Sequence, residues 1–183
     1  MPIHIIMHLL LYAMLSITAL TRAYTPITDP TIYMIRHGEK PGNGINGLNF
    51  QGLQRAQCLR SVFGRNSEYN IGYIMANMPG INGNRNRPLE TVKPLAADLG
   101  LTVDTSCDRN DYDCVKKAVK AYTGPGNILI CWEHIALTPI LETLGVEHAP
   151  EYPHGRFDLI WTVPPPYLSV TNERSENCPA LDL

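Results

Sequence analysis

Two periodicities of hydrophobic and polar residues alternate along most of the chain. Short runs of β-branched and apolar residues, typical of buried strands, occupy residues 31–35, 71–76, 101–103, 127–132 and 157–163. Between these runs, apolar residues recur with helical spacing over residues 50–63, 89–100 and 111–122. The alternation of strands and helices predicts an α/β fold, a three-layer α/β/α sandwich with a mainly parallel central sheet.

Two of the predicted helices have further signals. In residues 50–63 the apolar positions fall on one face, which predicts that this face is buried; they are Leu53, Ala56, Leu59, Val62 and Phe63. Thr138 and Pro139 are typical of an N-cap and a first helical residue, and predict a short helix that ends at Gly145.

The N-terminus differs from the rest of the chain. Residues 3–20 are almost entirely apolar, and small residues follow at the positions that a signal peptidase favours. We therefore expect residues 1–23 to be a signal peptide and the protein to be secreted; a retained membrane anchor is the alternative. Residues 24–166 then form one domain, and the polar residues 167–183 are expected to be an irregular tail.

Charge and cysteine content narrow the function classes. The formal net charge of −2 and the absence of a basic run give no electrostatic case for nucleic acid binding. Cys107 and Cys114 can close a small disulfide loop, Cys58 and Cys131 are expected to be buried thiols, and Cys178 has no obvious partner. No CxxC pair or His/Cys cluster has metal-ligand spacing, so we expect no metal site.

Charged residues follow two of the predicted strands. Arg36, His37 and Gly38 come directly after residues 31–35, and Glu133 and His134 follow residues 127–132. Ligands of open α/β sheets bind at the carboxyl ends of strands, where a guanidinium matches phosphate oxygens and a neutral imidazole can attack phosphorus.

Arg87 lies at the start of the helix predicted for residues 89–100, next to free backbone N–H groups that favour anions. Arg85 is a competing candidate for the same anion, but the spacing from Thr91 favours Arg87. Together with the strand ends, these residues predict a pocket for a tetrahedral dianion.

Four blocks of residues, in order, resemble the histidine phosphatase superfamily, the phosphoglycerate mutase-like proteins. The blocks are Arg36-His37-Gly38; Leu48, Gly52, Arg55 and Ala56; Arg87 with Thr91; and His134. The resemblance implies that His37 is the nucleophile that becomes phosphorylated, while Arg36, Arg87 and His134 hold the phosphoryl oxygens and Gly38 contributes to substrate binding. It also implies a phosphoglycerate mutase-like fold and a reaction without metal or cofactor, because the arginines provide the positive charge.

Two acidic residues depart from the family pattern. Glu133 stands where the family has a small or hydroxylic residue, and Glu90 lies within the third block. Either could protonate the leaving group, Glu90 could instead pair with Arg87, and Glu133 could orient an imidazole or point away. His148 and His154 are expected to have exposed structural roles, and the Gly/Asn-rich residues 41–49 could admit or cover substrate.

We therefore expect a metal-independent phosphatase that hydrolyses phosphomonoesters through a phosphohistidine intermediate on His37. The substrate would be a small phosphorylated molecule or a phosphoprotein, and no membrane partner is expected unless the N-terminal segment is retained as an anchor. The alternative is a secreted relative that binds a phosphorylated ligand or a partner without catalysis, because Glu133 is unusual and no acid is assigned.

Overall fold

The computed structural model describes residues 29–42 and 44–182, so the predicted signal peptide, residues 1–23, lies outside the described residues. In chain order the elements are β1 (Ile32–Arg36), α1 (Phe50–Val62), β2 (Ile71–Ala76), the 3₁₀ turn η1 (Ile81–Gly83), α2 (Arg87–Leu99), β3 (Val103–Asp104), α3 (Tyr112–Ala121), β4 (Asn127–Trp132), α4 (His134–Leu144), β5 (Leu159–Val163) and β6 (Asn172–Ser175). None of the helices in these residues is long and apolar enough to cross a membrane.

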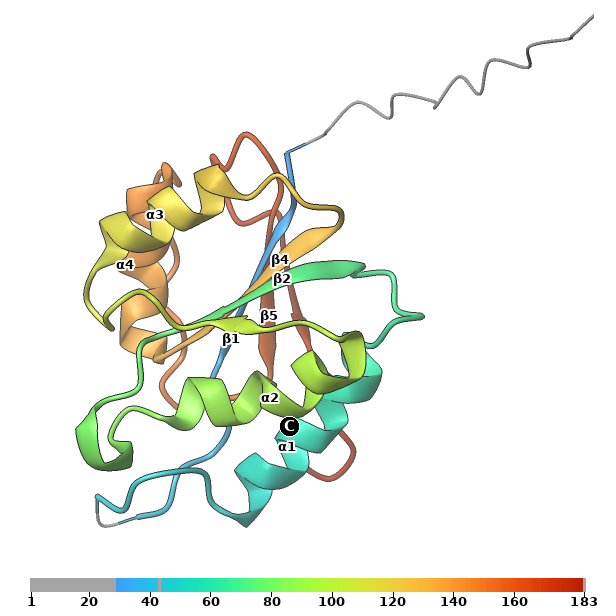
Figure 1. The fold of residues 1–183 in the computed structure, drawn as a ribbon, viewed down its shortest axis with the longest axis vertical. Coiled ribbons are helices and arrows are strands. Elements are labelled where there is room, and N and C mark those ends of the chain that lie inside the picture. The colour runs from blue at the N-terminus through green and yellow to red at the C-terminus, as the bar shows by residue number, and fades with distance from the viewer. Residues whose placement is uncertain (1–28, 43, 183) are drawn as a thin grey trace, which may run out of the picture.

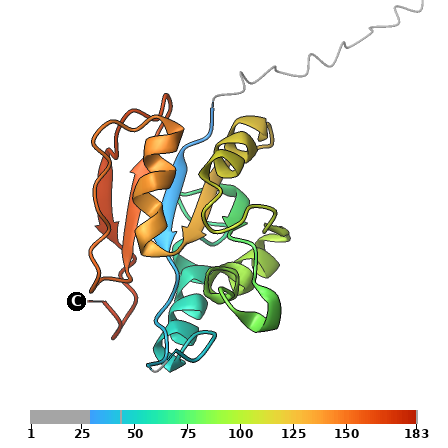
Figure 2. The same ribbon diagram turned by 90° about the vertical axis from the view of Figure 1, so that its left-hand side faces the viewer.

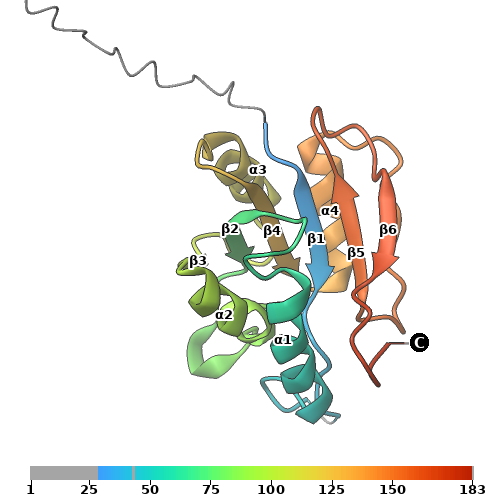
Figure 3. The same cartoon turned by 90° about the vertical axis from the view of Figure 1, so that its right-hand side faces the viewer.

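One mixed sheet of six strands, in the order β3-β2-β4-β1-β5-β6, forms the middle layer. The neighbours from β3 to β1 pair in parallel, whereas β5 is antiparallel to both β1 and β6. Helices α1 and α2 cover one face of the sheet, and α3 and α4 cover the other (Figures 1 and 3). The predicted three-layer α/β/α sandwich with a mainly parallel sheet is confirmed.

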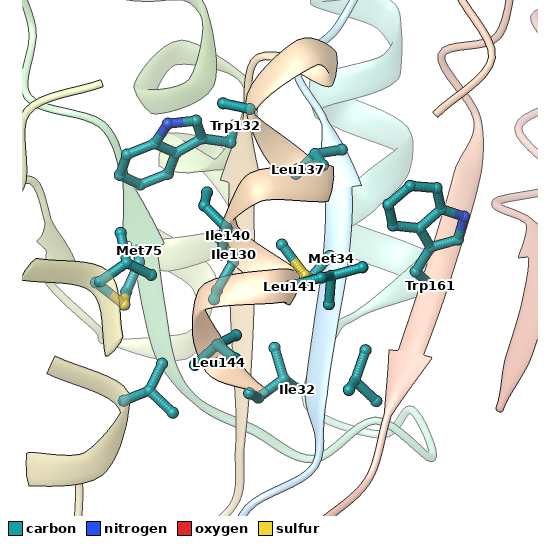
Figure 4. Packing of buried hydrophobic residues seen from close by; sticks show 14 of the residues in the cluster. Ile32, Met34, Met75, Ile130, Trp132, Leu137, Ile140, Leu141, Leu144 and Trp161 are labelled. Atoms are coloured by element: carbon teal, nitrogen blue, oxygen red, sulfur yellow. The ribbon is translucent and has the colours of Figure 1, made fainter. Parts of the chain in front are cut away.

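The central strand β4 is buried on both faces. Ile128, Ile130 and Trp132 belong to the core cluster that includes side chains of α3 and α4, whereas Leu129 and Cys131 belong to the cluster with α1 and α2. This division follows from the two-residue period of a strand. Figure 4 shows side chains of α4 packed over β1 and β4, and Figure 2 faces α4. The predicted burial of the Cys131 thiol is confirmed.

The buried face of α1 and its C-cap includes Ala56, Leu59 and Phe63, as expected from apolar spacing, but not Leu53. Leu53 is 54% exposed, whereas Arg55 is 1% exposed. The Arg55 guanidinium donates to Glu39 at 2.7 Å, to Glu176 at 2.6 Å and to Asp182 at 2.9 Å. Two of these acceptors belong to the C-terminal segment. A contact so distant in sequence leaves no trace in local periodicity, which explains why the expected face was wrong at Leu53.

The C-terminal segment is more ordered than predicted. Residues 172–175 form β6 at the sheet edge, and Cys178 is disulfide-bonded to Cys58 of α1. The expectation of an irregular tail was therefore wrong for residues 172–175, which pair with β5, and the expectation of a Cys58 thiol was wrong because its disulfide partner lies 120 residues away in the chain. The predicted disulfide between Cys107 and Cys114 is confirmed.

Helix α4 begins five residues earlier than predicted, at His134 rather than Pro139. Its first residue is His134 and its N-cap is Glu133, so Pro139 lies inside the helix. The hydroxyl of Thr138, which was expected to cap the helix, instead donates to the carbonyl oxygen of Pro150 at 2.6 Å. The earlier start places His134 on the first turn of a helix, where backbone N–H groups remain free.

Candidate active site

The sheet topology places the candidate residues next to one another. β1 and β4 are parallel neighbours, with Arg36 opposite Trp132 at their carboxyl ends, and the backbone N–H of His37 donates to the Trp132 carbonyl oxygen at 3.0 Å. The chain then leaves β1 for α1 on one face and leaves β4 for α4 on the other. Adjacent parallel strands whose helices diverge in this way open a crevice, the usual ligand site of α/β sheets.

His37 is held as a neutral imidazole with one free nitrogen. Its Nδ1 lies 2.7 Å from the carbonyl oxygen of Gly38, and because a carbonyl only accepts, Nδ1 carries the proton and donates it. Nε2 therefore keeps its lone pair. Burial, together with the charges of Arg36 and Arg87, lowers the pKa of His37 from 6.5 to about 4, so the ring is uncharged at neutral pH.

Gly38 fixes the turn that presents His37. Its N–H donates to the hydroxyl of Thr91 at 2.9 Å, and that hydroxyl donates to the Arg87 carbonyl oxygen at 2.8 Å. A Cβ on Gly38 would lie 3.0 Å from the backbone of Gly52, and one on Gly52 would lie 2.4 Å from the Glu39 carbonyl oxygen. Both polar backbone groups of Gly38 are used inside the protein, so the geometry favours positioning over the substrate contact predicted for it.

Arg87 and Glu90 hold the Gly/Asn-rich loop. Arg87, the first residue of α2, donates from Nε to the carbonyl oxygen of Gly47 at 3.1 Å. Glu90 accepts from the backbone N–H of Leu48 at 3.0 Å and from the amide of Asn86 at 2.8 Å. Both carboxylate oxygens of Glu90 are thus engaged, and Glu90 is not among the residues that line the cleft described below. Glu90 therefore contacts Leu48 and Asn86 rather than pairing with Arg87, and this geometry favours a role in holding the loop over that of a general acid.

Arg36 is buried at the end of β1 and holds the segment before β5 in place through hydrogen bonds. Its Nη1 donates to the carbonyl oxygens of His154 and Arg156, each at 2.7 Å, and its guanidinium carbon lies 3.7 Å from the centroid of the Phe157 ring. His154 is exposed, as expected, but its Nδ1 also lies 2.9 Å from Nε2 of His134. His154 therefore belongs to the surroundings of the site, which the sequence did not indicate.

One polar cleft of about 260 Å³ brings together three of the predicted residues: His37, Arg87 and Glu133. Its other walls come from Asn46, Asn77, Asn84, Arg85, Pro88 and Arg109. His134 instead lines a neighbouring cavity of about 300 Å³ with His154 and Tyr152. The structure thus places Arg85 and Arg87 at the same cleft, whereas Arg36 and His134 are not among its lining residues, although each is next in sequence to one of them.

Unused hydrogen-bond donors gather around this region. In the described part of the chain, five buried side-chain polar atoms have no partner, and three of them are Arg36 Nε, Arg109 Nε and His134 Nδ1. Buried polar groups are normally paired, so such a group needs an explanation. Two helices, α2 at Arg87 and α4 at His134, also begin here without a side-chain cap hydrogen bond. Cationic donors and helix N-termini together make a site suited to an anion.

Sequence reasoning missed Arg109, the ion-pair partner of Glu133, and Asn77. Arg109 Nη1 donates to Glu133 Oε2 at 2.8 Å. Arg109 lies inside the disulfide loop that follows β3, and Asn77 directly follows β2. The position of a polar residue just beyond a strand, already informative for His37 and Glu133, could have indicated Asn77, whereas Arg109 does not directly follow β3 and has no such signal.

The protonation of His37 predicts the pH profile. Only the neutral ring has a free Nε2, so kcat/KM for an aryl phosphate is expected to fall as the pH drops through about 4, rather than through 6.5. The measurement is kcat/KM across pH, corrected for ionisation of the substrate, since kcat/KM reports groups of the free enzyme. An acid limb near pH 6.5 would contradict the lowered pKa.

Comparison with known proteins shows the fold. No family model and no curated protein matches the chain. A solved structure of the protein histidine phosphatase SixA complexed with tungstate matches with a TM-score of 0.55 and 14% identity, covering 80% of this chain and 97% of that one. A putative phosphohistidine phosphatase SixA from Agrobacterium tumefaciens matches with a TM-score of 0.48, 11% identity and coverages of 80% and 97%. The open reading frame Rv3214 from Mycobacterium tuberculosis matches with a TM-score of 0.42, 14% identity and coverages of 63% and 80%. With the SixA–tungstate match and the sheet topology described above, the chain has the phosphoglycerate mutase-like fold, the fold of the histidine phosphatase superfamily.

Proposed function

We propose that this protein is a phosphatase that hydrolyses phosphomonoesters through a phosphohistidine on His37. The observation that carries the proposal is a neutral imidazole, with Nε2 free, at the wall of a cleft that arginines line. The SixA structure of the same fold is that of a protein histidine phosphatase complexed with tungstate, a tetrahedral oxyanion like phosphate. The substrate is a small phosphorylated molecule or a phosphoprotein.

The reaction proceeds in two steps. Nε2 of His37 attacks phosphorus, the P–N bond forms as the ester P–O bond breaks, and the electron pair leaves with the ester oxygen. Glu133, in the wall of the cleft, is the candidate that protonates this oxygen. Arg36, Arg87 and His134 stabilise the phosphoryl oxygens, so no metal is required for charge neutralisation. Water then cleaves the P–N bond, which releases phosphate and restores neutral His37.

Two features support an extracytoplasmic location. The disulfides Cys58–Cys178 and Cys107–Cys114 are typical of oxidising compartments, and the apolar residues 3–20 fit a secretory signal. Secretion therefore remains part of the proposal.

The test is to trap the intermediate. The domain is mixed with a radiolabelled aryl phosphate in the presence of a chelator, and the quenched protein is digested to locate the label. Label on His37 that is lost in acid and stable in base is expected, together with release of phosphate. Binding of inorganic phosphate without label or hydrolysis would overturn the proposal in favour of a non-catalytic phosphate-binding protein.

A further inference from the structure

The cleft carries more positive charge than transfer of one phosphoryl group uses. Arg85, Arg87 and Arg109 line it, and Glu133 is the one carboxylate among its described lining residues. The proposed mechanism assigns Arg87 to the transferred phosphoryl group and gives Arg109 no role. The wall that carries Arg109 is therefore available to the rest of the substrate.

The backbone around Arg109 is fixed at three points. The Cys107–Cys114 disulfide closes the loop, with 5.6 Å between the two Cα atoms. The indole of Trp132, a fully buried residue at the end of β4, donates to the Arg109 carbonyl oxygen at 2.9 Å. The backbone N–H of Met78 donates to the Cys107 carbonyl oxygen at 2.7 Å. A side chain held on such a loop loses little freedom when it binds, which favours recognition.

Most hydrogen-bond donors of the Arg109 side chain have no partner among the described residues. Among the described residues only its Nη1 donates a hydrogen bond, to Glu133 at 2.8 Å, and its Nε is buried without a partner. A guanidinium has five N–H donors in a planar fork that matches carboxylate and phosphate oxygens. Arg109 can therefore accept a second anion while it remains paired with Glu133.

The size of the cleft limits what that anion is attached to. A volume of about 260 Å³ is below the usual range for drug-sized ligands, so His37 and Arg109 are within reach of one small molecule. We propose that Arg109 determines specificity for a small phosphomonoester that carries a second anionic group, a carboxylate or another phosphate. This inference rests on the proposed phosphatase function.

The test uses matched aryl phosphates: carboxyphenyl phosphate, the isosteric but uncharged carbamoylphenyl phosphate, and phenylene bisphosphate, each as meta and para isomers. The wild-type kcat/KM is expected to be at least about tenfold higher for one anionic isomer than for its carbamoyl counterpart, because a charge-assisted hydrogen bond contributes more than the about 1.4 kcal/mol to which a tenfold ratio corresponds. A preference for the carboxylate alone or the bisphosphate alone identifies the second group. In Arg109→Gln this ratio is expected to fall to about one, mainly through KM, with partial recovery in Arg109→Lys.

Arg65→Gln is the matched control, since Arg65 is an exposed arginine outside the cleft and this variant should keep the wild-type ratio. A wild-type ratio near one for every isomer would overturn the inference without reference to any variant, as would a ratio that Arg109→Gln leaves unchanged. Hydrolysis of all the substrates at similar rates leaves the proposed function intact. Hydrolysis of none, with no label on His37, overturns the proposed function and this inference with it.

Discussion

Replacement of His37 by alanine is expected to lower kcat for aryl phosphate hydrolysis by roughly 10⁴- to 10⁶-fold, the range seen when a nucleophile is removed from a catalytic unit. Nε2 of His37 is the atom that forms the covalent bond to phosphorus in the proposed mechanism. His134 lines the neighbouring cavity rather than the cleft that His37 lines, so it is not positioned to replace the nucleophile. The measurement is steady-state hydrolysis with a chelator present.

His148→Asn is the matched control for this variant. His148 is exposed and has a positive φ of 55°, which asparagine tolerates well. This variant should retain wild-type kcat. Thermal unfolding of both variants separates loss of chemistry from loss of fold. Full activity in folded His37→Ala would show that another group attacks phosphorus.

Replacement of Arg55 by alanine is expected to reduce the free energy of unfolding by about 3–5 kcal/mol, because removal of one partner leaves buried charges uncompensated. Arg55 is 1% exposed and pairs with Glu39, Glu176 and Asp182. Burial, together with the nearby charges of Asp182 and Asp158, raises the pKa of Glu176 to about 8 although Arg55 acts to lower it. Without Arg55, the three acids would face one another.

The measurement is urea unfolding with the disulfides intact. Arg60→Ala, on the same helix, is the matched control: Arg60 pairs with Asp98 at 2.6 Å, but both side chains are well exposed, so only a slight change is expected. A loss in Arg55→Ala no larger than that in Arg60→Ala would contradict the stabilising role of the buried cluster. Because Glu39 follows Gly38 directly, kcat of Arg55→Ala should also fall at temperatures where the variant remains folded.

The fold could be predicted because its signals are local. Strand β4 is almost entirely apolar, and β1 ends at Arg36, one residue later than predicted, so both strand ends and the charged residues there were found closely from the sequence. Parallel pairing of β1 with β4 then brings His37 beside Glu133 and His134, so no other contact is needed to predict that these residues lie together. The four-residue spacing of Arg87 and Thr91 also has a physical reason. On the first turns of α2 this spacing lets the Thr91 hydroxyl donate to the Arg87 carbonyl oxygen while it accepts from the N–H of Gly38.

What could not be predicted depends on partners distant in sequence. The burial of Arg55 requires Glu176 and Asp182, and the Cys58–Cys178 disulfide joins residues 120 apart. The place of Arg109 in the cleft depends on the hydrogen bond from the Trp132 indole, which no local pattern reveals. The start of α4 was predicted too late because a typical capping residue, Thr138, has its hydroxyl partner in another segment.

The two disulfides also differ in when they can form during synthesis. Cys107 and Cys114 are seven residues apart, so they become available to each other almost as soon as their loop leaves the ribosome. Cys58 must wait for 120 further residues before Cys178 exists, and Glu176 and Asp182, two partners of Arg55, arrive at the same late stage. Until residues 176–182 are made, α1 of the nascent chain therefore carries an unpaired cysteine and an arginine that has only Glu39 of its three acidic partners, so the turn that presents His37 gains its full support late.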